Sequence, residues 1–259
     1  MIRRFELRDK DKINELIGCD PQLYILFNAL YNQNILEFNI FVCESSGSLS
    51  VLMKFGMNIY IKTDGKADIE EISSFLNMMG EKCEIYADDE DAVKLSEYLS
   101  GITKSENYYL AGLNTTPMRL SNDALYKKAE GYNDLLKIYK LLCDTGMIRD
   151  IDFDNFYLSR IHLINKRISR SLYIPDCDMA VCTASTMVET DNKAFLYAVA
   201  THENYRGRGM ATNLVSNLAN ILLNEGKECF ISFRSKEAQR VYEKIGFKTL
   251  KQKTVLYFN

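Results

Sequence analysis

The hydrophobic positions in the C-terminal half of the chain follow two different periods. Apolar residues at helical spacing predict helices within residues 135–142 and 157–168. Two extended segments follow at 179–188 and 194–200, and the polar run Glu189-Thr190-Asp191-Asn192 between them is typical of a hairpin turn. This half of the chain therefore combines amphipathic helices with a β-hairpin.

Helices and strands then alternate to the end of the sequence. The pattern predicts a helix at 210–222, a strand at 229–233, a helix at 238–245 and a final strand at 254–258. Gly226 and Gly246 mark the ends of the two helices, as glycine often does.

The N-terminal half shows a similar order more faintly. Its predicted helices are at 11–17, 23–31, 69–79 and 92–99, and its predicted strands are at 39–43, 50–55, 58–62, 83–86 and 108–113. The matching order suggests a degenerate internal duplication, although any chain that mixes helices and strands shows some similarity of this kind. The polar stretch 114–117, which ends in Pro117, predicts a boundary between two domains, 1–118 and 119–259.

The composition narrows the classes of function. The chain has 259 residues, of which 47% are hydrophobic and 26% are charged, and these values are ordinary for a globular protein. The net charge of -3 gives no general attraction to DNA or to anionic lipid. We therefore expect neither a nucleic-acid partner nor a membrane partner.

Cysteine and histidine usage indicates the compartment. The seven cysteines are scattered without CxxC pairs, which predicts reduced thiols, mostly in the core, of a cytoplasmic protein. The two histidines, His162 and His202, form no cluster with them, so no metal site is expected. The sequence shows neither a signal peptide nor an apolar run long enough to cross a bilayer, and we expect a soluble intracellular protein.

One loop carries the pattern of a phosphate site. The apolar segment 195–200 leads into Arg206-Gly207-Arg208-Gly209, and a predicted helix follows. In such a strand-loop-helix, backbone N–H groups and the helix dipole converge on one point and favour a pyrophosphate. Glycine lets the phosphate approach closely, while Arg206 and Arg208 add positive charge or brace the loop.

Three classes of phosphate-binding loop compete for this segment. A P-loop requires Gly-Lys-Ser/Thr, which is absent, and a dinucleotide-binding loop requires a third glycine where Thr212 stands. The dinucleotide loop also opens a large βαβ array, whereas only about fifty residues follow here. A third class, an acyl-CoA loop, fits better.

The segment resembles the GNAT superfamily of acyl-CoA-dependent N-acetyltransferases. The superfamily's cofactor signature is matched by Arg206, Gly209 and Ala211. The approach to the loop at 199–205 and the helix 238–247, with its alanine, its tyrosine and its final Gly-Phe, are also similar to the family. The resemblance is strong over about 124–259.

The resemblance implies an α+β (α/β) fold, in which helices flank a mixed, mostly antiparallel central sheet, and two tandem GNAT-like domains. Residues 119–259 would form an acetyltransferase domain that binds acyl-CoA, and 1–118 a degenerate copy without a cofactor loop. The equivalent loop of that copy, 63–68, contains two aspartates, which would repel a pyrophosphate.

The implied activity is that of an acyl-CoA-dependent N-acyltransferase, which moves an acetyl group from its co-substrate acetyl-CoA to a primary amine. The acceptor remains open between a small molecule, a protein N-terminus and a lysine. The protein would be a monomer or a homodimer.

The resemblance also assigns individual residues. Tyr242 matches the family tyrosine that is proposed to protonate the departing CoA thiolate. The alternative is that Tyr242 is only a core residue. Ser235 stands where many relatives carry a cofactor-contacting asparagine, and it is alternatively a helix N-cap. Backbone groups along the strand and the loop would hold the pantetheine arm and the pyrophosphate, namely those of Val199, Thr201, Arg206, Gly207, Arg208, Gly209, Met210, Ala211 and Thr212.

No general base stands out in the sequence. Histone-type relatives carry a glutamate where this chain has Lys193, and Glu189 and Asp191 fall in the predicted turn, where a solvated position is expected. We interpret His202 as a loop residue and not as the base. An acyl-CoA-binding sensor or an inactive homologue is therefore the alternative function.

A third alternative is an acyltransferase associated with nucleic acid. It is motivated by a basic run, for which a solvated helix face is the ordinary interpretation. The run consists of Arg160, Lys166, Arg167 and Arg170.

Overall fold

The computed structural model describes residues 1–32, 38–45, 47–115, 126–149 and 151–259. The chain forms two compact units, which are described separately. The first unit is Met1–Leu110 together with Leu250–Asn259, and the second unit is Ala111–Thr249. None of the described helices is long and apolar enough to span a membrane. The seven cysteines are free thiols, and four of them are buried.

The first unit is built on a twisted sheet whose strands lie in the order β1-β2-β3-β4-β5-β12-β6. β1 to β4 pair antiparallel, β4 and β5 pair parallel, and β5 and β12 pair antiparallel. The strands are β1 (Ile2–Arg4), β2 (Phe38–Ser45), β3 (Ser48–Phe55), β4 (Asn58–Thr63), β5 (Cys83–Ala87), β6 (Ile102–Leu113) and β12 (Lys248–Phe258).

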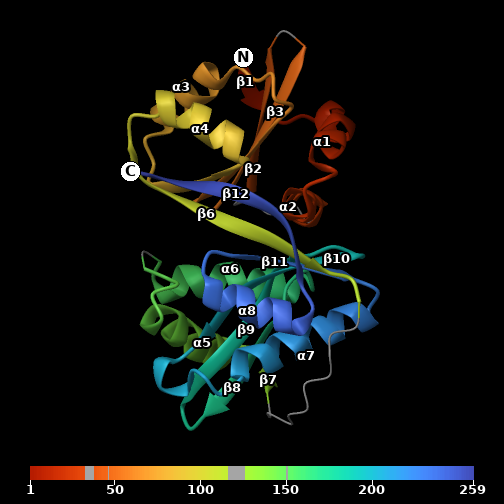
Figure 1. Cartoon of the computed structure of the whole chain (residues 1–259), viewed down its shortest axis with the longest axis vertical. Helices are drawn as coiled ribbons and strands as arrows, with labels where there is room; N and C mark the ends of the chain where they lie inside the picture. Colours follow the sequence, from red (N-terminus) through yellow and green to blue (C-terminus); the bar gives the residue numbers. More distant parts are fainter. Residues whose placement is uncertain (33–37, 46, 116–125, 150) are drawn as a thin grey trace. The chain divides into compact units, whose positions relative to one another are not determined.

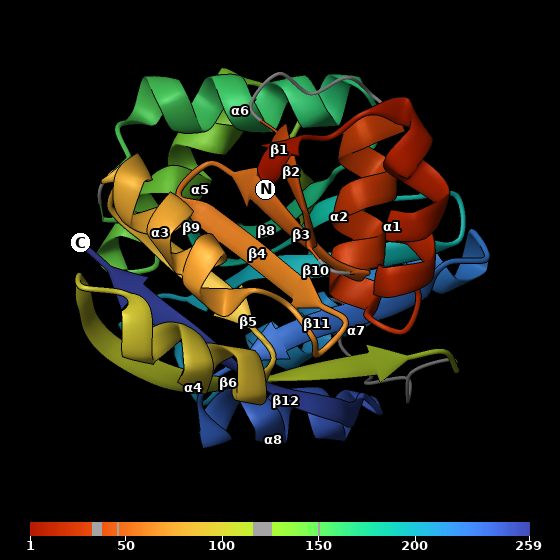
Figure 2. The same ribbon diagram turned by 90° about the horizontal axis from the view of Figure 1, so that it is seen from above.

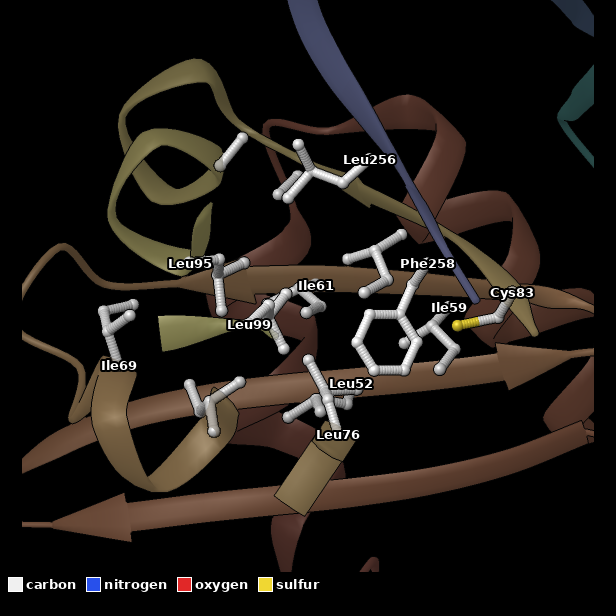
Figure 3. Close-up of a cluster of buried hydrophobic side chains, with 14 of the residues drawn as sticks. Leu52, Ile59, Ile61, Ile69, Leu76, Cys83, Leu95, Leu99, Leu256 and Phe258 are labelled. Atoms are coloured by element: carbon white, nitrogen blue, oxygen red, sulfur yellow. The ribbon is translucent and has the colours of Figure 1, made fainter. Parts of the chain in front are cut away.

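Helices cover both faces of this sheet. The helices are α1 (Lys10–Ile17), α2 (Pro21–Asn32), α3 (Ile69–Met79) and α4 (Asp89–Tyr98), with a short 3-10 turn η1 (Leu7–Asp9) before α1. α1 and α2 lie on one face, and α3 and α4 lie on the other (Figures 1 and 2). Apolar side chains of α3, α4 and the strands, among them Leu52, Leu76, Leu95 and Phe258, form a buried cluster (Figure 3).

The second unit has a sheet with the strand order β11-β10-β9-β8-β7. β7 to β10 pair antiparallel, and β10 and β11 pair parallel. The strands are β7 (Lys127–Lys128), β8 (Ser171–Asp176), β9 (Met179–Glu189), β10 (Lys193–Thr201) and β11 (Glu228–Phe233).

Helices again cover both faces. They are α5 (Tyr132–Asp144), α6 (Phe153–Asn165), α7 (Met210–Asn224) and α8 (Lys236–Ile245), and a 3-10 turn η2 (Glu203–Tyr205) lies between β10 and α7. α5 and α6 cover one face, and α7 and α8 cover the other (Figures 1 and 2). Buried residues of α5 and α6 pack with Tyr173, Ala198 and Ala200 of the sheet.

Each unit therefore contains a run of antiparallel strands followed by one parallel pair, whose two strands are connected by a helix. These elements are β4-α3-β5 in the first unit and β10-α7-β11 in the second. The predicted fold class, a mixed and mostly antiparallel sheet flanked by helices, is confirmed.

The structure differs from the sequence analysis in four strands, one of which is the two-residue β7, which was not predicted. The last strand, β12, was assigned to the second domain, but Leu250–Asn259 belong to the first unit because Thr254–Phe258 pair with β5. β1 and β8 were not predicted: β1 is only three residues long, and Pro175 interrupts β8. The predicted boundary at 118/119 lies outside the described residues.

Candidate functional site

A β-bulge shapes the middle of β10. Between Tyr197 and Ala200 this strand advances three residues while β9 advances two, from Ser185 to Thr183. The extra residue is absorbed by Ala198, which takes a left-handed φ of 53°. A non-glycine residue in this conformation is uncommon and is often found at a functional site.

The same bulge marks the point where β10 and β11 part. Their parallel pairing covers Lys193–Leu196 against Glu228–Ile231, although β10 continues to Thr201 and β11 to Phe233. Backbone groups beyond Leu196, including those of Val199, therefore lie outside the registered pairing with β11. An extended ligand can take the place of the missing strand contacts.

The loop after β10 presents a helix N-terminus without a side-chain cap. Gly207 and Gly209 adopt left-handed φ values of 77° and 74°, and a Cβ atom at either position would meet no atom within 4 Å. Glycine is therefore needed here for the backbone conformation. Gly209 is the N-cap of α7 and supplies no side-chain hydrogen bond, so no side chain among the described residues caps the amides of the first helical turn. Such a terminus favours an anion.

The two arginines of the loop brace its backbone. Arg206 donates from Nε to the carbonyl oxygen of Thr201 at 3.2 Å, and Arg208 donates from Nη2 to that of Asn204 at 2.9 Å. The guanidinium of Arg208 also lies 5.0 Å from the centre of the Tyr205 ring. Both side chains hold the loop in shape, one of the two roles expected from the sequence.

Two further contacts fix the start of the loop. His202 accepts a hydrogen bond at Nδ1 from the Asn204 amide at 3.3 Å, and its ring packs edge-on against Tyr205. The Tyr205 hydroxyl donates to the Asp176 carboxylate at the end of β8. His202 is a structural loop residue, as the sequence predicts.

Tyr242 points inward from α8. Its ring lies between Phe233 and Phe247, with centroid distances of 5.8 and 5.9 Å, and the residue is buried. Burial, with a smaller effect from the Cys182 thiol, raises the pKa of the Tyr242 phenol, which stays protonated at neutral pH. Its hydroxyl has no hydrogen bond to any residue that the structure describes.

Cys182 and Thr201 join β9 to the end of β10 on this side. Their Sγ and Oγ1 atoms are 3.4 Å apart. Burial raises the pKa of the Cys182 thiol to about 11, so the sulfur is a packed thiol and a poor nucleophile at neutral pH.

Ser235 has a clear structural role. Its Oγ accepts a hydrogen bond from the Ala238 amide at 3.1 Å and caps α8, which ends at Gly246 with a left-handed φ of 113°. The capping alternative is confirmed, while the contact to a cofactor remains a prediction.

The carboxylates considered as a general base are not equivalent. Glu189 was expected in a solvated turn, but it is the last residue of β9 and is 2% exposed. Its carboxylate is 2.7 Å from Arg170 and from Lys227, so a buried ion-pair network explains the difference. Asp191 is exposed in the turn, as expected. Lys193 pairs with Glu228 at 2.6 Å.

The basic run does not form one solvated face. Arg160 is 7% exposed and points into the core, and Arg170 pairs with Glu189 and Glu225. The interpretation of these cations as a solvated helix face is therefore wrong for both arginines, because their side chains fold onto the sheet.

The corresponding loop of the first unit is closed by acidic side chains. Asp68 caps α3 by accepting from the Glu71 amide at 3.0 Å. Asp64 accepts from the Ser48 hydroxyl at 2.7 Å and from the Leu49 amide at 3.0 Å. In the described part of the chain, no group of three or more His, Cys, Asp or Glu side chains is placed to hold a metal ion.

Comparison with known proteins finds one similar family in the C-terminal part of the chain. The FR47-like protein family matches residues 178–256, which include β10, the loop and α8. No curated protein sequence matches the chain.

Solved structures match nearly the whole chain. A Drosophila protein has a TM-score of 0.74 at 10% identity, covering 100% of this chain and 98% of its own. A GCN5-related N-acetyltransferase from Sphaerobacter thermophilus has a TM-score of 0.67 at 12% identity, covering 99% and 94%. A tandem GNAT protein from the clavulanic acid biosynthesis pathway has a TM-score of 0.59 at 11% identity, covering 99% and 97%.

The chain thus has the fold of the GNAT acetyltransferase superfamily, and the resemblance predicted from the sequence is confirmed. Within it, the sequence of residues 178–256 is similar to the FR47-like protein family.

Proposed function

We propose that the second unit binds acetyl-CoA and transfers its acetyl group to a primary amine. The observation that carries this proposal is the combination of a bulged, parted β10 with an uncapped α7 behind two left-handed glycines. A pyrophosphate suits the free amides of Met210, Ala211 and Thr212. A pantetheine arm carries amide groups, which suit the backbone of Val199 and Thr201.

The residues fit acetyl-CoA on structural grounds. An anion can approach the loop because neither glycine has a neighbouring atom within 4 Å of its Cβ position, and because the helix start is uncapped. Arg206 and Arg208 keep the loop in this conformation through carbonyl contacts. When bound, acetyl-CoA supplies a thioester, which an amine can attack.

The chain's own groups then serve this attack. Holding both reactants in place contributes up to about 7–11 kcal/mol. The Val199 amide, beside the bulge, is proposed as the donor to the developing oxyanion. Tyr242 is proposed as the donor to the departing sulfur. Because its pKa is raised above that of a thiol, it stabilises the thiolate by a hydrogen bond and retains its proton.

A water chain is proposed to deprotonate the amine, because Glu189 is engaged by two cations and Asp191 lies in an exposed turn. Activity should then rise with pH toward the pKa of the acceptor amine, about 10.

Thiol release from acetyl-CoA in the presence of a panel of primary amines tests the function, with mass spectrometry of the acetylated product. Amine-dependent release is expected. Binding of acetyl-CoA without any transfer would favour the alternative, an acyl-CoA-binding sensor or inactive homologue, which the engagement of Glu189 supports.

A further inference from the structure

Arg160 is a buried cation on the inner side of α6. Its Nη2 atom donates to the hydroxyl of Ser169 at 2.7 Å, to that of Ser171 at 3.2 Å and to the carbonyl of Thr186 at 3.0 Å. All three partners are neutral. The side chain is 7% exposed, yet Nε and Nη1 have no hydrogen bond to any residue that the structure describes.

The charge of Arg160 is not neutralised locally. The neighbouring cations Arg170 and Lys227 share the carboxylates of Glu189 and Glu225, which balances two positive with two negative charges. No described carboxylate lies within ion-pair distance of Arg160. Burial lowers the pKa of its guanidinium, and the more distant charge of Glu189 and the Tyr197 side chain oppose that effect only in part. A buried cation whose hydrogen-bond partners are all neutral gains stability when an anion pairs with it.

The position of this cation links it to the proposed chemistry. The guanidinium carbon lies 5.9 Å from the centre of the Tyr197 ring on β10. Tyr197 directly precedes Ala198, the bulged residue at which β10 parts from β11. Buried hydroxyls extend the polar cluster around Arg160 to β9, because Ser185 donates to Ser171 at 2.8 Å. An acceptor bound at the bulge would therefore lie close to an unpaired cation.

We propose that Arg160 binds a carboxylate of the acceptor, so that the acceptor class is amines that also carry a carboxylate, such as amino acids. This inference rests on the proposed function. Guanidinium donors bind carboxylates through charge-assisted hydrogen bonds, about twice as strong as neutral ones. A site of this kind discriminates strongly against an acceptor that lacks the anion, because the buried cation then stays unpaired.

Standard amino acids, each as the free acid and as the carboxamide, are the probes. In the transfer assay we expect kcat/KM for free acids to exceed that for the amides by about tenfold or more, equivalent to about 1.4 kcal/mol. Arg160→Gln should remove this preference. Arg167→Gln removes a neighbouring exposed cation and should retain it. Arg160→Lys keeps the charge and should retain part of the preference, which separates loss of charge from loss of fold.

A second readout does not depend on turnover. Thermal melting of the protein with the same acids and amides, without acetyl-CoA, should show stabilisation by the acids alone, and Arg160→Gln should abolish it. Absence of acetyl-CoA binding in a separate titration would overturn the proposed function and leave this readout intact. Three results would overturn the assignment of Arg160. The first is equal stabilisation and equal turnover with acids and amides, and the second is no response to either. The third is a folded Arg160→Gln variant that keeps the preference for acids.

Discussion

The two units build the same strand-loop-helix in opposite ways. α3 of the first unit begins with a carboxylate cap from Asp68, whereas α7 of the second begins with Gly209 and no cap. A bound carboxylate already supplies the negative charge that a helix N-terminus favours. The first loop therefore satisfies its own amides, and the second leaves them for a ligand.

The gap between the parallel strands differs in the same direction. The registered pairs of β4 and β5 end at Tyr60 and Tyr86, and beyond them Lys62 forms an ion pair with Asp88 at 2.6 Å. The corresponding region of the second unit has the bulge at Ala198. An ion pair therefore links the ends of β4 and β5 in the first unit. At the corresponding place in the second unit, where β10 and β11 part, the backbone of β10 is bulged. The same arrangement of strands and helix is structural in the first unit and, in our proposal, binds a ligand in the second unit.

The helix after each parallel strand adds a third contrast. Seven residues after the N-cap Asp88, α4 carries Leu95, and seven residues after the N-cap Ser235, α8 carries Tyr242. Both side chains are buried. The second unit therefore differs from the first by a hydroxyl at this position, as expected if that hydroxyl has a chemical role.

The largest expected effect comes from the loop glycines. Gly209→Val places a β-branched residue at a left-handed φ of 74° and disturbs the start of α7. We expect acetyl-CoA affinity to fall by a hundredfold or more, measured by calorimetry. Gly65→Val imposes the same change at a φ of 84° in the first loop and is the matched control. Its affinity should be unchanged, and equal losses in the two variants would erase the distinction between the loops.

Tyr242→Phe removes only the hydroxyl that Leu95 lacks. Because a positioned proton or hydrogen-bond donor contributes about 10²–10⁴-fold, kcat should fall tens-fold or more while acetyl-CoA affinity stays the same. Steady-state kinetics with a binding titration measure both. Tyr108→Phe, which alters a buried tyrosine of the first unit bonded to Gln22, is the control. A fall in kcat of less than about threefold would make Tyr242 a core residue.

The ion pairs of the first unit predict acid sensitivity. Burial would raise the pKa of Asp88, but hydrogen bonds from Lys251 and Lys62 and the charge of Lys253 outweigh it and hold the pKa at about 2, below the ordinary 3.8. A depressed folded-state pKa stabilises the fold above pH 4 and loses that contribution as pH falls toward 2. We expect the free energy of unfolding to fall by about 2 kcal/mol over this range.

Denaturant melts at a series of pH values measure this loss. In Asp88→Asn the loss should be smaller by that amount. An unchanged pH profile in the variant would show that the carboxylate contributes nothing.

The smallest effects concern the helix caps. Ser235→Ala and Asp68→Ala should each lower the free energy of unfolding by about 1 kcal/mol, since each removes a side-chain bond to an N-terminal amide. Chemical denaturation measures both. Acetyl-CoA affinity should change by less than about threefold in Ser235→Ala, because its oxygen is engaged by the Ala238 amide. A tenfold loss would instead establish the cofactor contact of Ser235.

Local signals in the sequence predicted most elements and the loop. The periodicity of apolar residues predicts the bounds of α3 and β9 almost to the residue. Gly207 and Gly209 mark the loop in the sequence, and both adopt left-handed φ values in the structure. Ser235 was recognisable as a cap from its position alone. These features depend on neighbours within a few residues, which is why a single sequence contains them.

Non-local features were beyond prediction. The partner of β12 is set by packing of Leu256 and Phe258 into the core of the first unit, and an alternating strand pattern does not name its partner. Glu189 looked like a turn residue because its cations, Arg170 and Lys227, lie 19 and 38 positions away. The bulge at Ala198 could not be predicted because the residue with the left-handed φ is an alanine, and a glycine is the usual sequence signal for that conformation.

Calorimetric titration of the full chain with acetyl-CoA tests the central claim most directly, because it counts the loops that bind. The uncapped loop of the second unit and the capped loop of the first predict one site per chain, with roughly micromolar affinity, or about 8 kcal/mol. Two equivalent sites per chain, or no binding at all, would contradict the assignment of opposite roles to the two loops.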